Sequence, residues 1–193
     1  MKIVGVGCGP GLLTEQAIAV IAGATLIYGS DRAIGIARPH ISPSCTVKTI
    51  DDFKSLRKLG GDAVVLSTGD PMLAGLGYLD GEVVPGISSL QIALARLHIP
   101  LARVAIVVAH GTGHEKAIDE TLAELARKRI ILLLTDPKFD LTGLYSRLEV
   151  VIPPVRIAVC EDLGYPYERI VTGSPQDPPR PRSDLYTMVI GNF

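Results

Sequence analysis

Short apolar runs rich in valine and isoleucine alternate with segments of helical periodicity along the first half of the chain. The apolar runs predict strands near 2–6, 24–28, 46–49, 62–67 and 82–84, and the periodic segments predict helices near 14–22, 50–59 and 88–97. In the second helix the apolar stripe consists of Ile50, Phe53, Leu56 and Leu59. Strands that are apolar along their whole length, separated by helices, are typical of a parallel sheet covered on both faces.

The alternation starts again after His98. We expect strands near 103–109, 129–135, 155–160 and 185–191 and helices near 115–127 and 139–148. The chain is therefore predicted to form two α/β domains, residues 1–101 with a parallel sheet and residues 102–193 with a mixed sheet. The proline-rich segment 174–182 lacks the backbone donors that a sheet needs, so we expect a surface loop there.

Composition indicates a globular protein with small-molecule partners. Hydrophobic residues make up 47% of the 193 positions, enough for a core, yet the longest apolar runs are far shorter than the ~20 residues that span a bilayer. The chain begins with a strand-like segment rather than a secretory signal, and its three cysteines are too widely spaced for a zinc clip. With a net charge of -1 and no basic block, we expect a cytoplasmic protein that binds neither nucleic acid nor membrane.

Four turns rich in glycine or proline follow predicted strands, at the edge where open α/β sheets bind ligands. The first, GVGCGPG at 5–11, does not fit the dinucleotide pattern G-x-G-x-x-G, because Pro10 or Leu12 stands at the last glycine position. Asp31 nevertheless lies at the sequence distance of a ribose-binding acid. A nicotinamide site therefore stays an alternative.

The second and third turns each have a structural and a functional interpretation. Gly69 lets the backbone approach a ligand, and Asp70 could accept hydrogen bonds from ribose hydroxyls or an ammonium group, although Gly-Asp-Pro is commonly a plain turn. In the third turn, Ser88 and Ser89 either cap the following helix or contact a ligand.

The fourth turn, HGTGH at 110–114, contains two histidines. Across a glycine-rich turn this spacing does not place both rings on one face, and no cysteine or third ligand stands nearby. We therefore expect no metal site. No nucleophile is paired with an oriented base, so the sequence does not predict a catalytic triad either.

In chain order, the first three turns resemble the hallmarks of the tetrapyrrole methylase family: a V-G-x-G-P-G turn, a G-D-P loop and a P-G-I-S/T-S/A segment. They stand here at 6–11, 69–71 and 85–89. The resemblance covers nearly the whole chain and implies two α/β domains with S-adenosylmethionine in the cleft between them, and a homodimer. The family's cofactor contacts would correspond to Pro10, Thr68, Gly69, Asp70, Leu73, Ser88, Ser89 and Leu134.

Further segments resemble one branch of that family, which methylates carbon 5 of cobalt-precorrin-7. The most similar segment is 160–170, where Asp162 replaces the branch's usual asparagine. The resemblance implies a C-methyltransferase of cobalamin biosynthesis that acts on a precorrin macrocycle, and it makes an enzyme that methylates carbon 15 and removes a carboxyl group a candidate partner. Between Gly75 and Val83 the chain is shorter than the helical stretch usual in the branch.

Methyl transfer from a sulfonium ion is an in-line displacement, so positioning supplies much of the rate and no dedicated acid is required. His110 is a candidate base for proton loss, with a structural role at a strand end as the alternative. The carboxylates of such a substrate call for cationic partners, for which the candidates are Arg32, Arg38, His40, Arg180 and Arg182, with a solvated surface as the alternative.

Other functions remain open on the same residues. Within the family, the chain could methylate another tetrapyrrole position, as uroporphyrinogen methyltransferases do, or a macromolecule, as diphthine synthases do. From a different class, it could be a nicotinamide-dependent dehydrogenase or a non-catalytic nucleotide-binding module.

Overall fold

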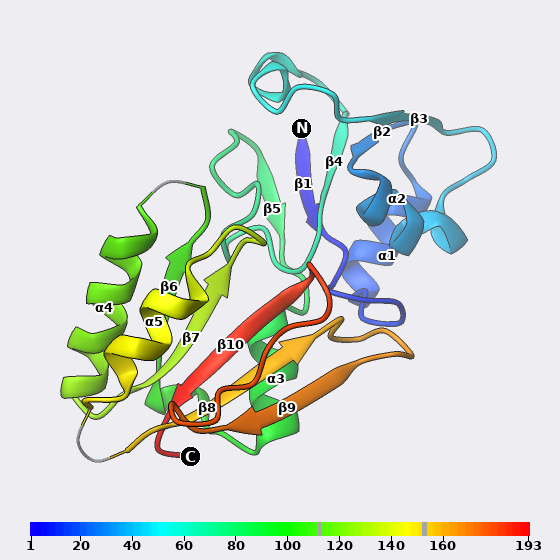
Figure 1. Ribbon diagram of the computed structural model, residues 1–193. Coiled ribbons are helices and arrows are strands. Elements are labelled where there is room, and N and C mark those ends of the chain that lie inside the picture. The colour runs from blue at the N-terminus through cyan, green and yellow to red at the C-terminus, as the bar shows by residue number, and fades with distance from the viewer. Residues whose placement is uncertain (112, 152–153) are drawn as a thin grey trace. The chain divides into compact units, whose positions relative to one another are not determined.

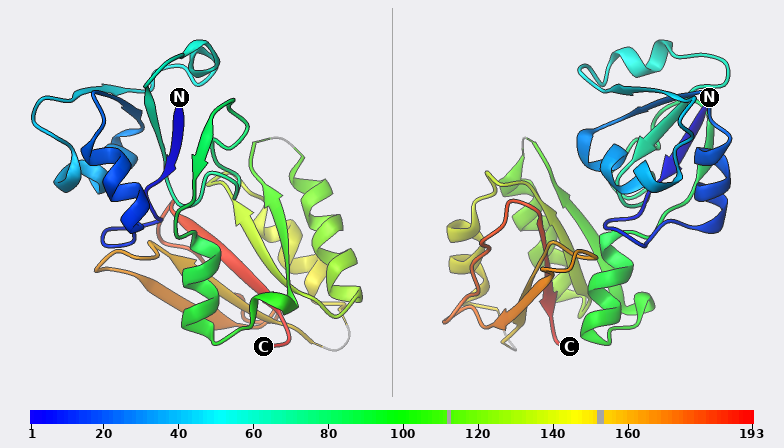
Figure 2. Two further views of the ribbon diagram at one scale, coloured as in Figure 1. Left: turned by 180° about the vertical axis from the view of Figure 1, so that it is seen from behind. Right: turned by 90° about the vertical axis from the view of Figure 1, so that its right-hand side faces the viewer.

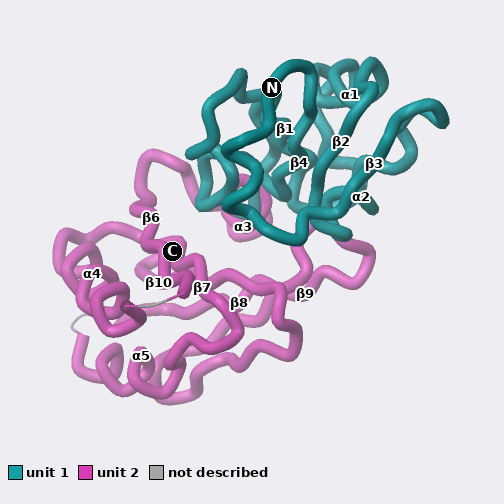
Figure 3. Tube along the Cα trace, turned by 90° about the horizontal axis from the view of Figure 1, so that it is seen from above, with its two compact units in different colours: residues 1–89 teal, residues 90–193 magenta. Residues whose placement is uncertain are grey.

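The computed structural model describes residues 1–111, 113–151 and 154–193. The chain divides into two compact units, Met1–Ser89 and Leu90–Phe193, which Figure 3 shows in two colours. This division places nearly all of the helix expected near 88–97 with the second unit. The domain limits 1–101 and 102–193 stay a prediction, while the two α/β units themselves are confirmed.

The first unit is built on a five-stranded sheet in which every neighbouring pair of strands is parallel, as predicted. Its strands are β1 (Lys2–Gly5), β2 (Leu26–Gly29), β3 (Thr46–Thr49), β4 (Val64–Ser67) and β5 (Glu82–Val84). They lie in the order β3-β2-β4-β1-β5 (Figure 1). Val4 and Val65 are both fully buried, because chain covers both faces of the sheet.

Helices cover one face of this sheet and irregular chain covers the other. The helices are α1 (Glu15–Ala22) and α2 (Asp31–Ala37). Ile21 and Ile34 bring these helices into one core with the sheet, whereas Leu56 and Leu79 pack on the opposite face. Right-handed crossovers explain the two layers, since the chain moves one way across the sheet from β1 to β3 and returns from β3 to β5.

The second unit has a mixed five-stranded sheet, as predicted. Its elements are α3 (Ser89–Leu97), β6 (Val104–Ala109), α4 (His114–Ala126), β7 (Ile130–Thr135), α5 (Leu141–Leu148), β8 (Arg156–Glu161), β9 (Arg169–Gly173) and β10 (Tyr186–Gly191). The strand order is β6-β7-β10-β8-β9, in which only β6 and β7 are parallel. Helices α4 and α5 pack on one face, and α3 lies on the other (Figure 2). None of the helices in the described ranges has the length and apolar character needed to cross a membrane.

Segment 50–59 is not the helix that its apolar stripe predicted. Only Ser55–Lys58 forms a single 3-10 turn, and Phe53 is 48% exposed. The four apolar positions recur every three residues, which is the period of a 3-10 helix, whereas an α-helical stripe mixes spacings of three and four. Asp52 also accepts a hydrogen bond from the Lys54 backbone N–H at 2.9 Å, which favours a turn.

Helix α2 and strand β9 were not predicted. Helix α2 follows β2 almost directly, with Ser30 as its N-cap, whose Oγ accepts from the Ala33 N–H at 3.3 Å. Strand β9 pairs antiparallel with β8, so most of segment 160–170 is the connection of a hairpin. Asp162 adopts a φ of +49° there, a left-handed conformation that asparagine and aspartate tolerate better than most residues.

The buried carboxylate of Glu161 holds this hairpin and the proline-rich loop together. It pairs with the guanidinium of Arg169, and it accepts hydrogen bonds from the backbone N–H groups of Arg182 and Ser183, the latter at 2.8 Å. The loop is also held by the Tyr145 hydroxyl, which donates to a proline carbonyl of the loop at 2.6 Å. Segment 174–182 is a loop outside the sheet, as predicted. Two of its backbone groups are held by hydrogen bonds, the Pro179 carbonyl and the Arg182 N–H.

Candidate functional site

Three backbone turns of the first unit meet at the carboxyl ends of β1, β4 and β5. The Gly69 N–H donates to the Gly7 carbonyl at 2.8 Å, and the Gly7 N–H donates back to the Gly69 carbonyl at 3.3 Å. The Cys8 N–H donates to the Ile87 carbonyl, in the turn after β5, at 3.0 Å. The three motifs that the sequence presents separately therefore form one backbone assembly.

Close packing between backbones explains the glycines of this assembly. A Cβ on Gly86 would lie 2.3 Å from the Gly69 carbonyl oxygen, and a Cβ on Gly5 would lie 2.6 Å from the Gly86 nitrogen. Gly69 has a different requirement, because its φ is +68° and the nearest atom to a Cβ there is 3.8 Å away. The assembly is thus tightly packed inside and leaves room beside Gly69, where a ligand can approach the backbone.

Asp70 connects two of the three turns. Its Oδ1 accepts a hydrogen bond from the Met72 N–H at 2.8 Å, and its Oδ2 accepts one from the Gly86 N–H at 3.0 Å. Each carboxylate oxygen can still accept a second hydrogen bond, from a ligand hydroxyl or ammonium group. Asp70 therefore has an organising role in addition to the ligand-binding role that the sequence suggested.

The residues expected to bind a cofactor lie on these turns, except for one in the second unit. Pro10 is exposed at the tip of the first turn, and Ser88 is buried at the end of the third. Thr68, Gly69, Asp70, Leu73 and Ser89 have intermediate exposure.

A pocket of about 320 Å³ lies next to the assembly, at the adjacent ends of β2 and β4. Its lining consists of Ser30, Ile50, Phe53, Leu66, Ser67, Thr68, Ala74, Gly75, Leu76 and Tyr78. The connection after β2 leaves on one face of the sheet and the connection after β4 leaves on the other, which creates the kind of crevice where open α/β sheets bind ligands. The segment between Gly75 and Val83, which is shorter than the family branch suggests, forms one wall.

In the second unit, Asp136 joins the turns that follow β6 and β7. Its Oδ2 accepts from the Gly111 N–H at 2.7 Å and lies 3.3 Å from His114 Nε2, while its Oδ1 accepts from the Lys138 N–H at 2.8 Å. The hydrogen bond from Gly111, followed by that from Lys138, holds the pKa of Asp136 below its usual value; burial opposes this and His114 adds to it. The ionised carboxylate fixes both turns, a connection that the sequence did not reveal.

His110 and Leu134, the remaining expected site residues, lie at the carboxyl ends of these same two strands. Ala109 pairs with Thr135 in parallel register, so His110 follows directly after the last pair. His110 is exposed and Leu134 is buried. Thr112, between the two histidines, lies outside the described residues. Within the described ranges, no group of three or more His, Cys, Asp or Glu side chains could hold a metal ion.

The hairpin connection within 160–170, on which the branch resemblance mainly rests, has structural contacts. Glu168 accepts from the Arg96 guanidinium at 2.7 Å and from the Gly164 N–H at 2.8 Å, and Glu161 pairs with Arg169. These side chains stabilise the second unit.

Comparison with known proteins gives consistent results. Residues 2–178 match the family of Tetrapyrrole (Corrin/Porphyrin) Methylases. A probable cobalt-precorrin-7 C(5)-methyltransferase of Methanocaldococcus jannaschii is 31% identical over 185 residues, which cover 86% of this chain and 85% of that protein. The crystal structure of the cobalamin biosynthesis precorrin-6Y methylase from Archaeoglobus fulgidus superimposes with a TM-score of 0.75 at 31% identity, covering 100% of this chain and 97% of that one.

A third relative shares the fold at lower identity. The crystal structure of a uroporphyrin-III C-methyl transferase from Thermus thermophilus, complexed with S-adenyl homocysteine, has a TM-score of 0.67 at 20% identity. The alignment covers 98% of this chain and 96% of that one.

Proposed function

Because this chain belongs to the tetrapyrrole (corrin/porphyrin) methylases, we propose that it transfers a methyl group from S-adenosylmethionine to carbon 5 of cobalt-precorrin-7 in cobalamin biosynthesis. The observation that carries the proposal is the backbone assembly at the carboxyl edge of the first sheet, with the open approach to Gly69. The choice of substrate follows the two relatives at 31% identity, which are a cobalt-precorrin-7 C(5)-methyltransferase and a precorrin-6Y methylase.

The turns of the first unit fit the chemistry of S-adenosylmethionine. The room beside Gly69 admits a ligand against the backbone, and the second lone pairs of the Asp70 carboxylate can accept from ribose hydroxyls or the ammonium group. The other proposed contacts are Pro10, Thr68, Leu73, Ser88, Ser89 and Leu134. When bound, the cofactor supplies an electrophilic methyl group on sulfur. The protein's contribution is to hold that group in line with the nucleophilic carbon of the substrate, which accounts for much of the rate.

We place His110 as the acceptor of the proton released from the methylated carbon. Its exposed position after β6 leaves the ring accessible, and the Asp136 carboxylate holds the neighbouring Gly111 backbone. His110→Ala is expected to lower kcat about 100-fold and to leave the affinity for S-adenosylhomocysteine unchanged. Single-turnover assays over a range of pH measure this. An unchanged rate would assign His110 the purely structural role instead.

Calorimetric titration distinguishes the methyltransferase from the nicotinamide alternative. The protein is expected to bind S-adenosylhomocysteine and not NAD. The GVGCGPG turn supports this expectation, because proline removes a backbone donor that a pyrophosphate would need. Binding of NAD alone would contradict the proposal.

We further propose a cytoplasmic homodimer, and an enzyme that methylates carbon 15 and removes a carboxyl group as its partner. Both follow from the family resemblance. Light scattering on the purified chain measures the first, and co-purification with the carbon-15 enzyme measures the second. A monomer at working concentrations would contradict the dimer.

A further inference from the structure

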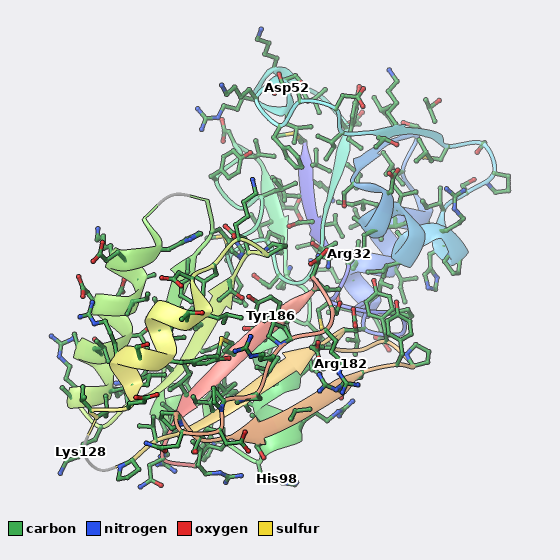
Figure 4. The ribbon with its side chains drawn as sticks, in the orientation of Figure 1. Arg32, Asp52, His98, Lys128, Arg182 and Tyr186 are labelled. Carbon is green, nitrogen blue, oxygen red and sulfur yellow. The ribbon has the colours of Figure 1, made fainter. Side chains whose placement is uncertain are left out.

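Arg32 lies where β2 ends, beside the turn that follows β4. Its Nη2 donates a hydrogen bond to Thr68 Oγ1 at 2.9 Å, and Figure 4 labels this side chain at the edge of the first unit's sheet. Because the Thr68 oxygen is the acceptor in this bond, its own hydroxyl hydrogen remains to donate elsewhere. The pair therefore presents a guanidinium and a hydroxyl donor side by side.

The charge of Arg32 has no acidic partner among the described residues. The adjacent Asp31 accepts instead from the Thr49 hydroxyl at 3.3 Å, and the Asp70 carboxylate accepts backbone N–H groups. A guanidinium has five N–H donors in a planar fork that matches a carboxylate. Only one of the five donates to a protein atom described for this unit, so most of the fork is open to an anionic ligand.

The lining of the pocket at the ends of β2 and β4 indicates which kind of molecule would carry such an anion. Thr68 belongs to its lining, so the Arg32 guanidinium stands at its rim. The rest of the lining is mainly apolar, and two aromatic side chains remain half exposed there, Phe53 at 48% and Tyr78 at 52%. Exposed aromatic side chains around a concave site are suited to an apolar ring system, and the adjacent cation is suited to a carboxylate that the ring bears.

We propose that the Arg32 guanidinium, held by its hydrogen bond to Thr68, forms a subsite for one peripheral carboxylate of the tetrapyrrole substrate, with the edge of the macrocycle against the pocket lined by Phe53 and Tyr78. The inference rests on the proposed function, because precorrins carry acetate and propionate side chains around their ring. Arg32 is then a residue that sets substrate specificity, since an uncharged macrocycle of the same shape gains nothing from it. The carboxylate of the cofactor is the other source of the same chemistry, and the test separates the two.

The test compares two probes and three variants of the full chain. The probes are a cobalt corrin with free side-chain carboxylates and its fully methyl-esterified form, each titrated by absorbance in the presence of S-adenosylhomocysteine. Arg32→Gln is expected to weaken binding of the free acid about tenfold, as expected for the loss of a charged hydrogen bond, and to leave binding of the ester unchanged. Arg32→Lys keeps the positive charge but not the planar fork of donors, and it is expected to lose less affinity for the free acid than Arg32→Gln.

Arg38→Gln is the matched control. Arg38 follows the last residue of α2, whereas Arg32 lies at its start, and Arg38 is likewise exposed. It is expected to bind the free acid like the unaltered chain. Calorimetry with S-adenosylhomocysteine is repeated on each variant, and all are expected to keep the original affinity.

Each contrary outcome overturns a defined part of the account. Equal binding of the free acid by Arg32→Gln and the unaltered chain removes the subsite and leaves the methyltransferase assignment standing. A parallel loss with both corrin probes assigns Arg32 to general packing. A loss of affinity for S-adenosylhomocysteine assigns the carboxylate to the cofactor. If the unaltered chain binds S-adenosylhomocysteine but not the free acid, the proposed substrate class fails, and the subsite fails with it.

Discussion

Gly86→Ala is expected to abolish binding of S-adenosylhomocysteine and to lower the free energy of unfolding by about 3 kcal/mol. The new Cβ would stand 2.3 Å from the Gly69 carbonyl oxygen and 2.8 Å from the Gly5 carbonyl carbon. Both neighbours are backbone atoms, one at the end of β1 and the other hydrogen-bonded to the Gly7 N–H, so the clash can be relieved only by separating the turns. Urea unfolding and calorimetry on the same preparation measure the two effects.

Gly35→Ala provides the control for this substitution. Gly35 lies on the exposed side of α2, and a Cβ there would meet nothing within 4 Å. Alanine in place of glycine within a helix is expected to raise stability by about 0.5 kcal/mol and to leave cofactor affinity unchanged. If Gly86→Ala bound S-adenosylhomocysteine with the original affinity, the backbone assembly would not be the cofactor site.

Glu161→Gln is expected to lower the free energy of unfolding by about 2–3 kcal/mol near neutral pH. The carboxylate is 1% exposed and pairs with Arg169, and the amide of glutamine would leave that guanidinium without a charged partner. The amide oxygen can still accept from the backbone N–H groups of Arg182 and Ser183, which share Oε1, but the amide then places an N–H donor against the Arg169 guanidinium, which pairs with Oε2. The hairpin would loosen as a result.

The effect of Glu161→Gln depends on pH in a predictable direction. Burial would raise the pKa of Glu161, but the hydrogen bonds from Arg182 and Ser183 and the charge of Arg169 outweigh it, so the folded pKa lies below the usual value. A lowered folded pKa gives stability that is present above the unfolded pKa of about 4.3 and is lost as the pH falls through the folded pKa. The difference between the two proteins is therefore expected to shrink on acidification.

Urea unfolding at neutral and acidic pH tests this, with Asp119→Asn as the control. Asp119 forms an exposed ion pair with Arg147, so its substitution is expected to cost less than about 0.5 kcal/mol at either pH. Figure 4 labels Arg182, whose backbone is one of the groups that Glu161 holds. An equal cost for Glu161→Gln and Asp119→Asn would contradict the role assigned to the buried carboxylate.

The central strands of both units, such as β4 and β7, could be predicted from the sequence because a strand buried on both faces is apolar without interruption. The order of the strands could not, since β1, β2 and β4 resemble one another in composition. Only the structure shows that β2 and β4 are adjacent strands. It also shows the hydrogen bond between Arg32 and Thr68, which are 36 residues apart in the sequence. Strand β9 was missed for a local reason, because its sequence RIVTG is only partly buried and has no continuous apolar run.

The turns of the candidate site could be predicted from the sequence, but the hydrogen bonds that join one turn to another could not. The order of the glycine motifs, through the family that they resemble, predicts Gly69 and Asp70 as cofactor contacts, which stay a prediction. The hydrogen bond from Gly86 to Asp70 spans 16 residues and that from Gly111 to Asp136 spans 25, and both depend on how separate turns fold against each other. Local spacing gave a wrong prediction at segment 50–59. Its apolar residues recur every three positions, which we interpreted as an α-helix, but the segment contains only a 3-10 turn.

Transfer of a labelled methyl group tests the central claim most directly. The protein is incubated with cobalt-precorrin-7 and S-adenosylmethionine labelled in its methyl carbon, and the product is examined by NMR. The account predicts a single labelled methyl group on carbon 5 of the macrocycle. A label on any other carbon would contradict the proposed position of methylation, and no transfer to the macrocycle would contradict the proposed substrate.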